Sequence, residues 1–457
     1  MQASVDTIAA EATPKGRGGV AVIRLSGPQA GAIAEKIVGQ SLRIRYAEYV
    51  QFVSPDGKPI DQGIALYFKG PHSFTGEDVV EFQCHGSPIV VDYLLETIFA
   101  HGGRMARPGE FSERAFLNDK MDLVQAEAVA DLIASGTRRS AEAALRSLDG
   151  VFSSQVKTLV VELIHLRTFI EATLDFPEED IEMIENARVR EALVLILREC
   201  DHLQSAAHSG VLLQEGVQLA LIGPPNAGKS SLMNQLAAQD VAIVSNIPGT
   251  TRDVLKEKIS LRGIPLDLLD TAGLRQSVDA IEGEGIRRTQ RVMQQAECIL
   301  LLVEDGQPED LQKLLLEYAD FFIDRPMLVV FNKIDLTGCS PGRIEDVNLP
   351  GGGQCPAVRV SIKTSQGLER LEQTLLEVLG WAGEAEGQFS ARRRHLDALR
   401  RAHASLQQGL AIYQNTARLE LLAEECRLAQ EALSEITGEF RADDLLGAIF
   451  STFCIGK

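Results

Sequence analysis

Short apolar runs separated by polar turns mark roughly the first hundred residues of the chain. The runs at residues 20–25 (VAVIRL), 64–68 and 79–84 predict strands, and residues 29–38 predict a short helix. Proline and glycine stand in the connections between them, where turns are expected. This region therefore predicts a mixed α/β unit.

Two later stretches show the spacing of amphipathic helices. From about residue 118 to residue 210, apolar residues recur three and four positions apart, and the same spacing returns after a glycine-rich joint at 380–387. Gly438 is expected to end the second set, and residues 443–453 predict one last amphipathic helix. One economical arrangement packs both sets together as an all-α domain, with the segment between them inserted.

The inserted segment opens on a strand, a loop and a helix. Residues 217–222 (VQLALI) predict a buried strand, and the loop from Gly223 to Ser231 (GPPNAGKSS) fits the pattern G-x-x-x-x-G-K-[ST]. Backbone N–H groups of such a loop close around phosphate oxygens. Lys229 can reach the terminal phosphates, and the Ser230 hydroxyl can ligate Mg²⁺. The segment therefore predicts an α/β P-loop domain that binds a nucleotide.

Two further strand ends carry the other signatures of a GTPase. An apolar run at 266–269 leads into the D-x-x-G motif that begins at Asp270, and a run at 327–331 leads into the N-K-x-D motif that ends at Asp335. In GTPases the first aspartate lies beside Mg²⁺, and the second accepts hydrogen bonds from guanine N1 and N2. Adenine lacks that pair of donors, so the motifs imply GTP rather than ATP.

Composition and charge mainly exclude some classes of protein. The 457 residues are 45% hydrophobic and 24% charged, which is typical of a soluble globular protein of about three domains. No apolar run approaches about 18 residues, and the first residues lack a basic start followed by an apolar core, so we expect a cytoplasmic protein without a membrane span. The formal net charge of −19 opposes non-specific binding of nucleic acid, so any such contact must be local.

The cysteines are spread along the chain. They are odd in number and include no C-x-x-C pair. This pattern argues against a disulfide framework and against a zinc site. They are Cys84, Cys200, Cys298, Cys339, Cys355, Cys426 and Cys454.

Four polar segments have no role in this scheme. Residues 13–19 (TPKGRGG), 73–78 (SFTGED) and 107–116 (RPGEFSERAF) contain glycine, and glycine loops are more often turns than ligand sites, so we interpret each as structural. The one basic run, at 392–394, lies at the start of a predicted helix, where solvent exposure is the simplest interpretation.

Four segments of the chain together closely resemble the MnmE (also called TrmE) family of tRNA modification GTPases. They are TPKGRGG followed by a strand, GEFSERAFLNDKMDL at 109–123, the switch sequence PGTTRD at 248–253, and CIGK at 454–457. The likeness covers essentially the full length. It implies a multidomain protein with a tetrahydrofolate-binding and dimerisation domain at 1–117, a helical domain from 118–210 and 385–457, and an inserted Ras-like G domain at 211–384.

The resemblance also implies partners and a reaction. Members of the family are homodimers that work with the flavoprotein MnmG, in a heterotetramer, on the wobble uridine of certain tRNAs. They add an aminomethyl-type group such as carboxymethylaminomethyl at C5, with 5-formyl- or methylene-tetrahydrofolate as the one-carbon source. GTP hydrolysis drives a conformational cycle through pairing of the G domains.

The hydrolytic residue cannot be the glutamine of Ras-like proteins. That position is Leu274 here, which has no polar atom to orient a water molecule. Glu282 matches the catalytic glutamate of the family, which orients the attacking water through a second water. Glu284 is a rival by position, and only the resemblance favours Glu282.

The resemblance also implies that a monovalent cation compensates the negative charge on the phosphates in the transition state of hydrolysis. Asn226 matches the family's K⁺ ligand in the phosphate loop, although ordinary loop capping would also explain an asparagine there. The switch residues Ser245, Ile247 and Thr250 match further K⁺ ligands, and Thr251 matches the switch threonine that ligates Mg²⁺ beside Ser230. Arg252 as an arginine finger is the alternative source of positive charge, and a surface contact in the switch is favoured for it.

The loop that closes over guanine departs from the usual Ser-Ala-Lys, because Ile362 places a larger side chain next to the base. Contact there is mainly through backbone N–H groups, so guanine binding should survive. The resemblance gives the following GTP-binding residues: Asn226, Ala227, Gly228, Lys229, Ser230, Ser231, Ser245, Asn246, Ile247, Pro248, Gly249, Thr250, Thr251, Asp270, Thr271, Ala272, Gly273, Asn332, Lys333, Asp335, Ser361, Ile362 and Lys363.

The implied folate site combines one carboxylate with three cations. The family match gives Arg24, Glu81, Lys120 and Lys457. A carboxylate can accept hydrogen bonds from the pterin, and cations suit the glutamate tail. Cys454 is a candidate for the modification chemistry, with packing as a small apolar residue the equal alternative.

Two other classes of GTPase remain alternatives. Ribosome-assembly proteins of the Era and EngA type share the G domain and add compact basic RNA-binding modules, whereas this chain has only the run at 392–394. A structural dynamin-like G protein would fit a nucleotide-gated dimer but leaves the folate-type residues without a role. The flanking segments therefore favour the tRNA-modifying class.

Overall fold

The computed structural model divides the chain into two compact units, residues 1–130 with 433–457, and residues 131–432. The division crosses the helices α4 (Leu123–Ala134) and α14 (Leu419–Thr437). The three domain boundaries expected from the sequence stay a prediction. The structure describes residues 6–175, 182–239, 256–270, 290, 292–322, 325–350, 352–381, 383, 389–416, 418–439, 443–453 and 456.

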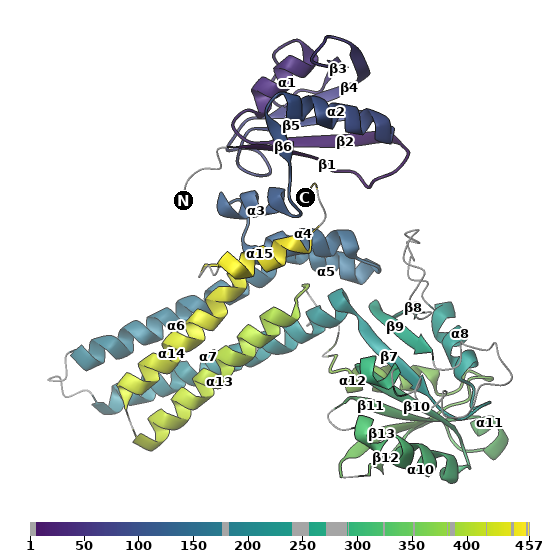
Figure 1. Ribbon diagram of the computed structural model, residues 1–457. Helices are drawn as coiled ribbons and strands as arrows, with labels where there is room; N and C mark the ends of the chain where they lie inside the picture. The colour runs from purple at the N-terminus through teal and green to yellow at the C-terminus, as the bar shows by residue number, and fades with distance from the viewer. Residues whose placement is uncertain are drawn as a thin grey trace. The chain divides into compact units, whose positions relative to one another are not determined.

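A six-stranded sheet forms the centre of the first unit, in the order β3-β4-β5-β2-β1-β6 (Figure 1). The paired strands are antiparallel except for β1 and β6, which are parallel. The strands predicted within β2, β4 and β5 are confirmed. The bounds are β1 Thr7–Glu11, β2 Gly18–Ser26, β3 Glu48–Val53, β4 Pro59–Phe68, β5 Val79–Gly86 and β6 Gly103–Met105.

The two faces of this sheet are covered by different elements. Residues of β1 to β5 on one face, such as Ala9 and Phe82, pack against the helices α1 (Ala30–Val38) and α2 (Pro88–Ala100). On the other face, Ile8 and Ala10 pack against Ala106 and against Phe111 of α3 (Glu110–Leu117). Only part of the second face is therefore covered by this cluster.

The last described residues complete the first unit. Helix α15 (Asp443–Ser451) packs Phe450, together with Phe453, against Phe116 of α3 and Leu123 of α4. Gly438 follows the end of α14 with φ of 84°, as its predicted role as a helix stop requires. Farther on, a Cβ at Gly456 would lie 2.2 Å from the carbonyl oxygen of Glu11, so the tail rests directly on the end of β1.

Long helices from both flanks of the insertion lie side by side in the second unit, as predicted (Figure 1). The rings of Phe152 and Phe389 stack at 4.5 Å, and Arg167 of α6 donates to Gln430 of α14 at 3.1 Å. These contacts join the N-terminal helical segment to the C-terminal one. The bounds are α5 Arg138–Leu148, α6 Val151–Asp175, α7 Glu182–Glu215 and α13 Arg393–Thr416.

The inserted segment folds around a sheet of seven described strands in the order β12-β13-β11-β10-β7-β9-β8. The strands from β13 to β9 are parallel, and β12 and β8 pair antiparallel at the two edges. Separate apolar cores fill the two faces, as in a doubly wound sheet. The strands are β7 Val217–Ile222, β8 Lys256–Leu261, β9 Ile264–Asp270, β10 Cys298–Glu304, β11 Met327–Asn332, β12 Gly342–Asn348 and β13 Gln354–Arg359.

Helices and a short 3₁₀ turn connect these strands. Helix α8 follows β7, α11 follows β11, and α12 follows β13, which is the alternation expected of a P-loop domain. Within the described residues, no helix is long and apolar enough to cross a membrane. The helical bounds are α8 Lys229–Gln239, α10 Pro308–Glu317, η1 Ala319–Phe321, α11 Ile334–Thr337 and α12 Leu368–Val378.

The six cysteines that the structure describes are free thiols, and Cys454 lies outside the described residues. Five of the six are buried, and burial raises the pKa of the Cys200, Cys298, Cys355 and Cys426 thiols to about 12. These four buried cysteines are therefore packing residues rather than nucleophiles.

Candidate functional site

The phosphate loop lies between β7 and α8, with its helix beginning at Lys229. Gly228 has φ of 106°, and a Cβ there would lie 2.4 Å from Nδ2 of Asn332, so only glycine fits. The ammonium group of Lys229 donates to the carbonyl oxygens of Gly223 and Pro224, at 2.6 and 2.7 Å. Asn226 is exposed in the loop with φ of 66°.

Asn332 connects the three loops that make this site. Its side chain, on a residue that is 4% exposed, donates to the carbonyl oxygen of Ala227 at 2.7 Å and accepts from the Ile362 N–H at 3.1 Å. The phosphate loop, the N-K-x-D motif and the closing loop are thus tied together by one amide at the carboxyl ends of parallel strands. This is the edge of a doubly wound sheet where ligands bind.

The guanine end of the site is ordered by Ser361. Its hydroxyl donates to Oδ1 of Asp335 at 2.7 Å and accepts from the Thr364 N–H at 3.2 Å. Lys333 is held by Glu304 at 2.6 Å, and Lys363 is exposed. The carboxylate expected to bind guanine therefore has a fixed orientation.

The structure buries Ile362 of the closing loop, and its expected place next to the base stays a prediction. Its side chain is 7% exposed and belongs to the apolar core on one face of the sheet. Its Cδ1 lies 3.5 Å from the position of a Cβ on Gly228. The larger side chain fills space beneath the phosphate loop, which is why the closing loop accommodates isoleucine.

Several expected site residues lie outside the described residues. Asp270 ends β9, but its side chain is not among the described ones. The Mg²⁺ ligand in the switch, three of the four K⁺ ligands and both candidate glutamates therefore stay predictions. The residues concerned are Ser245, Asn246, Ile247, Pro248, Gly249, Thr250, Thr251, Arg252, Thr271, Ala272, Gly273, Leu274, Glu282, Glu284, Cys454 and Lys457.

Arg24 and Glu81 are partners across the N-terminal sheet. They face each other in register on β2 and β5, and the Arg24 Nε donates to the Glu81 Oε1 at 2.8 Å. The guanidinium carbon lies 5.3 Å from the centre of the Phe74 ring and 5.9 Å from that of Phe111. The side chains of Arg24 and Glu81 remain 22% and 18% exposed. A carboxylate and a cation of the candidate folate site are thus brought together beside two aromatic rings.

Lys120 lies beside the loop that carries Phe74. A Cβ at Gly76 would lie 3.3 Å from Cγ and Cδ of Lys120, and Asn118 donates from its side chain to the Thr75 carbonyl at 2.7 Å. The structure therefore places Lys120 against the same 73–78 loop as Arg24.

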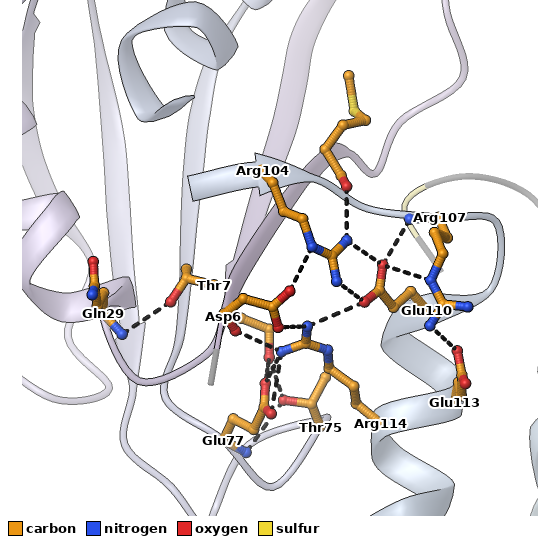
Figure 2. A network of polar contacts seen from close by, with 12 residues as sticks. Asp6, Thr7, Gln29, Thr75, Glu77, Arg104, Arg107, Glu110, Glu113 and Arg114 are labelled. Atoms are coloured by element: carbon orange, nitrogen blue, oxygen red, sulfur yellow. Dashed lines mark hydrogen bonds and ion pairs between the residues drawn. The ribbon is translucent and has the colours of Figure 1, made fainter. Parts of the chain in front are cut away.

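The sequence interpretation missed a network of ion pairs in the same unit (Figure 2). Arg114, with a side chain 5% exposed, binds Glu77 at 3.0 Å, Asp6 at 2.9 Å and Glu110 at 3.1 Å, and Arg104 also binds Asp6 and Glu110. The sequence alone favours a structural role for the segments 73–78 and 107–116 without indicating these pairs. The spacing of Glu110 and Arg114, one turn apart among apolar residues of a helix, was the available signal.

Glu110 is the most strongly perturbed carboxyl of this network. Burial by itself would raise its pKa, but hydrogen bonds from Arg104, from the Arg107 N–H and from Arg114 outweigh burial and lower the pKa to about 2. The carboxylate is therefore ionised at neutral pH although its side chain is 3% exposed.

The expectation that the basic run faces solvent holds for Arg393, whose side chain is 64% exposed, but not for Arg392, whose side chain is 24% exposed. Arg392 pairs with Asp131 at 2.6 Å, and Arg393 pairs with Glu215 at 2.7 Å and also with Glu297. Carboxylates of the same unit thus neutralise these charges, which leaves less positive potential for nucleic acid than the sequence suggested.

Two family models match nearly the whole chain between them. The model described as "GTP-binding protein TrmE N-terminus" matches residues 7–120, and the model described as "MnmE helical domain" matches residues 123–454.

Curated proteins are similar to this chain over its full length. The "tRNA modification GTPase MnmE" of Vibrio cholerae serotype O1 (strain ATCC 39315 / El Tor Inaba N16961) is 50% identical over 458 residues, which cover 99% of this chain and 100% of that protein. The protein of the same name from Legionella pneumophila (strain Corby) is 49% identical over 456 residues, with the same coverage. That of Coxiella burnetii (strain RSA 493 / Nine Mile phase I) is 48% identical over 454 residues and 99% of both chains.

Solved structures match in part. The G domain of the T. maritima FeoB iron transporter is 26% identical and covers 35% of this chain and 98% of its own, with a TM-score of 0.26. A likeness of this size carries no argument about the chain.

Proposed function

Because this chain belongs to the MnmE family of tRNA modification GTPases, we propose that it hydrolyses GTP in order to modify the wobble uridine of tRNA. The expected product carries an aminomethyl-type group such as carboxymethylaminomethyl at C5. The enzyme is a GTP hydrolase, and the alternative of an Era- or EngA-like ribosome-assembly protein is set aside, because Arg392 and Arg393 of the basic run form ion pairs inside their own unit.

The observation that carries the GTPase proposal is the link through Asn332. One buried amide joins the phosphate loop to the guanine-closing loop. Asp335, held by Ser361, would then accept from guanine, and Ser230, at the start of α8, would ligate Mg²⁺ with Thr251. Mg²⁺ would neutralise charge that develops on the phosphates during hydrolysis.

The N-terminal unit supports the proposal of a tetrahydrofolate site. Glu81 offers a carboxylate to pterin N–H groups, and Arg24 and Lys120 offer positive charge to the glutamate tail. Gly456, between the candidate residues Cys454 and Lys457 in the sequence, rests on the end of β1 in the same unit. A folate such as 5-formyl- or methylene-tetrahydrofolate would be the one-carbon source.

The remaining parts of the proposal follow the family. We infer a cytoplasmic homodimer that acts on tRNA together with the flavoprotein MnmG in a heterotetramer. K⁺ would bind Asn226, Ser245, Ile247 and Thr250, favour pairing of the two G domains and order the switches, after which Glu282 would orient the attacking water. A carboxamide oxygen in an exposed loop, as at Asn226, suits a weakly hydrated cation.

The first test is GTP hydrolysis in KCl against NaCl at matched ionic strength, over a range of protein concentrations. We expect faster hydrolysis in KCl, with a specific rate that rises with protein concentration. Asn226→Ala should remove the response to K⁺ while GTP binding persists, and Asn234→Ala, an exposed asparagine on α8, is the matched control. Equal rates in both salts for the unmodified protein would remove the cation from the proposal and restore Arg252 as a candidate finger.

The catalytic role is tested by Glu282→Ala beside Glu284→Ala. The first substitution should slow hydrolysis by about 100-fold or more, with GTP affinity nearly unchanged, and the second should have little effect. A collapse of GTP binding in Glu282→Ala would assign that residue a structural role instead.

The tRNA reaction requires reconstitution with MnmG, tRNA, GTP and a tetrahydrofolate. Mass spectrometry of the tRNA nucleosides should then show the modified uridine, and omission of GTP should abolish it. Modification that proceeds without the protein would refute its part in the reaction.

A further inference from the structure

The 73–78 loop lies between two cations of the proposed folate site. Phe74 of this loop covers the Arg24 guanidinium at 5.3 Å, and Gly76 lies against the side chain of Lys120. A displacement of the loop would therefore change the surroundings of Arg24 and Lys120 together. Whatever holds the loop in place controls the shape of the site.

Helix α3 holds the loop near its C-terminal end through Arg114. The guanidinium contacts both oxygens of the Glu77 carboxylate, at 3.0 and 3.3 Å, and the same carboxylate accepts from the Ser26 hydroxyl at 2.7 Å (Figure 2 shows Arg114 beside Glu77). Ser26 is on the same strand as Arg24, two residues away. The loop is thus clamped between α3 and the strand that carries the candidate cation.

The residue after α3 holds the middle of the loop. Asn118 donates from its side chain to the Thr75 carbonyl at 2.7 Å, and Lys120 lies two residues farther on. The hydroxyl groups of Thr75 and Ser26 lie 2.6 Å apart in the interior. Two independent attachments, one ionic and one amide, therefore fix the same short loop.

Arg114 itself has little freedom to move. Besides Glu77, its guanidinium binds the Asp6 carboxylate and backbone carbonyl and the Glu110 carboxylate. Its side chain is 5% exposed, so it is too deeply placed to serve as a surface contact for a partner. A planar guanidinium that serves three partners at once is not replaced by lysine, which offers a single point charge.

We propose that Arg114 and Asn118 are positioning residues for the tetrahydrofolate site, which they shape by holding the 73–78 loop. The inference rests on the proposed folate function. The two residues act through the loop and not by contact with the folate. A bound ligand gains affinity from groups that are already in place, so release of the loop should weaken binding without removing any binding group.

The test measures binding of 5-formyltetrahydrofolate to the full chain by isothermal titration calorimetry. Arg114→Lys and Asn118→Ala should each raise Kd by about tenfold, which corresponds to about 1.4 kcal/mol. Arg107→Ala is the matched control, because this 64% exposed side chain of the same segment pairs with Glu113 at 2.9 Å and with Glu110 at 3.6 Å rather than with Glu77 of the loop. GTP hydrolysis, carried by the other unit, should be unchanged in all three.

A double-mutant cycle separates positioning from direct contact or general destabilisation. Phe74→Leu should also raise the Kd of the folate. When Asn118→Ala is added to Phe74→Leu, the Kd should rise by much less than a further tenfold, because both substitutions act through the same loop. Full additivity would overturn the inference. If Arg114→Lys fails to fold, the folate Kd of Asn118→Ala alone tests the inference.

Two negative results have different meanings. Unchanged Kd in both positioning variants, with the unmodified protein binding the folate, would overturn this inference and leave the proposed folate site standing. Absence of binding to the unmodified protein would overturn both.

Discussion

Replacement of Glu110 by glutamine tests the ionic core of the N-terminal unit. The folded state lowers the Glu110 pKa from 4.5 to about 2. A shift of this size corresponds to about 3 kcal/mol of folding free energy when the carboxylate is ionised. Because the folded pKa lies below the unfolded one, this stabilisation is complete above the unfolded pKa and is lost as the pH falls toward the folded pKa.

The pH dependence follows from that sign. Glu110→Gln should destabilise the unit by about 3 kcal/mol at pH 7, where the unmodified carboxylate is ionised in both states. At pH 3 the carboxyl is protonated in the unfolded state and mostly ionised in the folded state. The difference in unfolding free energy between the unmodified protein and Glu110→Gln should therefore fall to about 1.4 kcal/mol. Glutamine preserves the size of the side chain, and loss of charge against Arg104 and Arg114 is the intended change.

The assay must report on the N-terminal unit alone. The single tryptophan, Trp381, is partly buried, packs against the core of the other unit and would report on that one. We would unfold the protein in urea at pH 7 and at pH 3 and read residues 104–117 by a short deuterium pulse at one fixed pH. Glu113→Gln, which removes an exposed pair with Arg107, should cost less than about 1 kcal/mol. The reasoning would be refuted if Glu110→Gln lowered the free energy of unfolding equally at both pH values, or if Glu110→Gln and Glu113→Gln lowered it equally.

Three further predictions concern other contacts. Asn332→Ala leaves the Ile362 N–H and the Ala227 carbonyl without their shared partner, so the G domain should lose about 2–5 kcal/mol of stability and bind GTP more weakly. Thermal unfolding followed by the fluorescence of Trp381 measures the loss of stability. Gly456→Ala would force a Cβ against the Glu11 carbonyl, and we expect weaker folate binding in calorimetry with unchanged GTP hydrolysis. Arg393→Ala should leave the salt dependence of tRNA binding unchanged, since its charge is already paired with Glu215 and Glu297; a slope smaller by about one would show a phosphate contact instead.

The regular elements could be predicted because each depends on local pattern. Residues 217–222 form a strand because a continuous apolar run suits a strand buried on both faces, and Gly438 ends a helix because glycine accepts a positive φ. The phosphate loop and the N-K-x-D motif were recognisable for the same reason. Their residues are close in sequence, and their chemistry restricts which residues can occupy them.

The features that sequence did not predict depend on contacts between distant residues. Glu77 and Arg114 are far apart in the chain, and nothing in either segment indicates that they meet in the interior. The partners of Arg393 likewise come from the end of α7 and from the residue that precedes β10. Ile362 lies in a loop, as its motif indicates, but its side chain is part of the core, which the motif alone does not reveal. Charge pairing at a distance has no periodic signature, so only a structure can reveal it.

The packing of α15 on α3 has a consequence for synthesis of the chain. Phe116 and Leu123 leave the ribosome about 300 residues before Phe450 and Phe453, which cover them. At about 5–20 residues per second, this apolar surface waits on the order of 15–60 s for its partner. During that time the nascent N-terminal unit presents an unfilled groove to chaperones, and premature termination anywhere in the G domain would leave it open permanently.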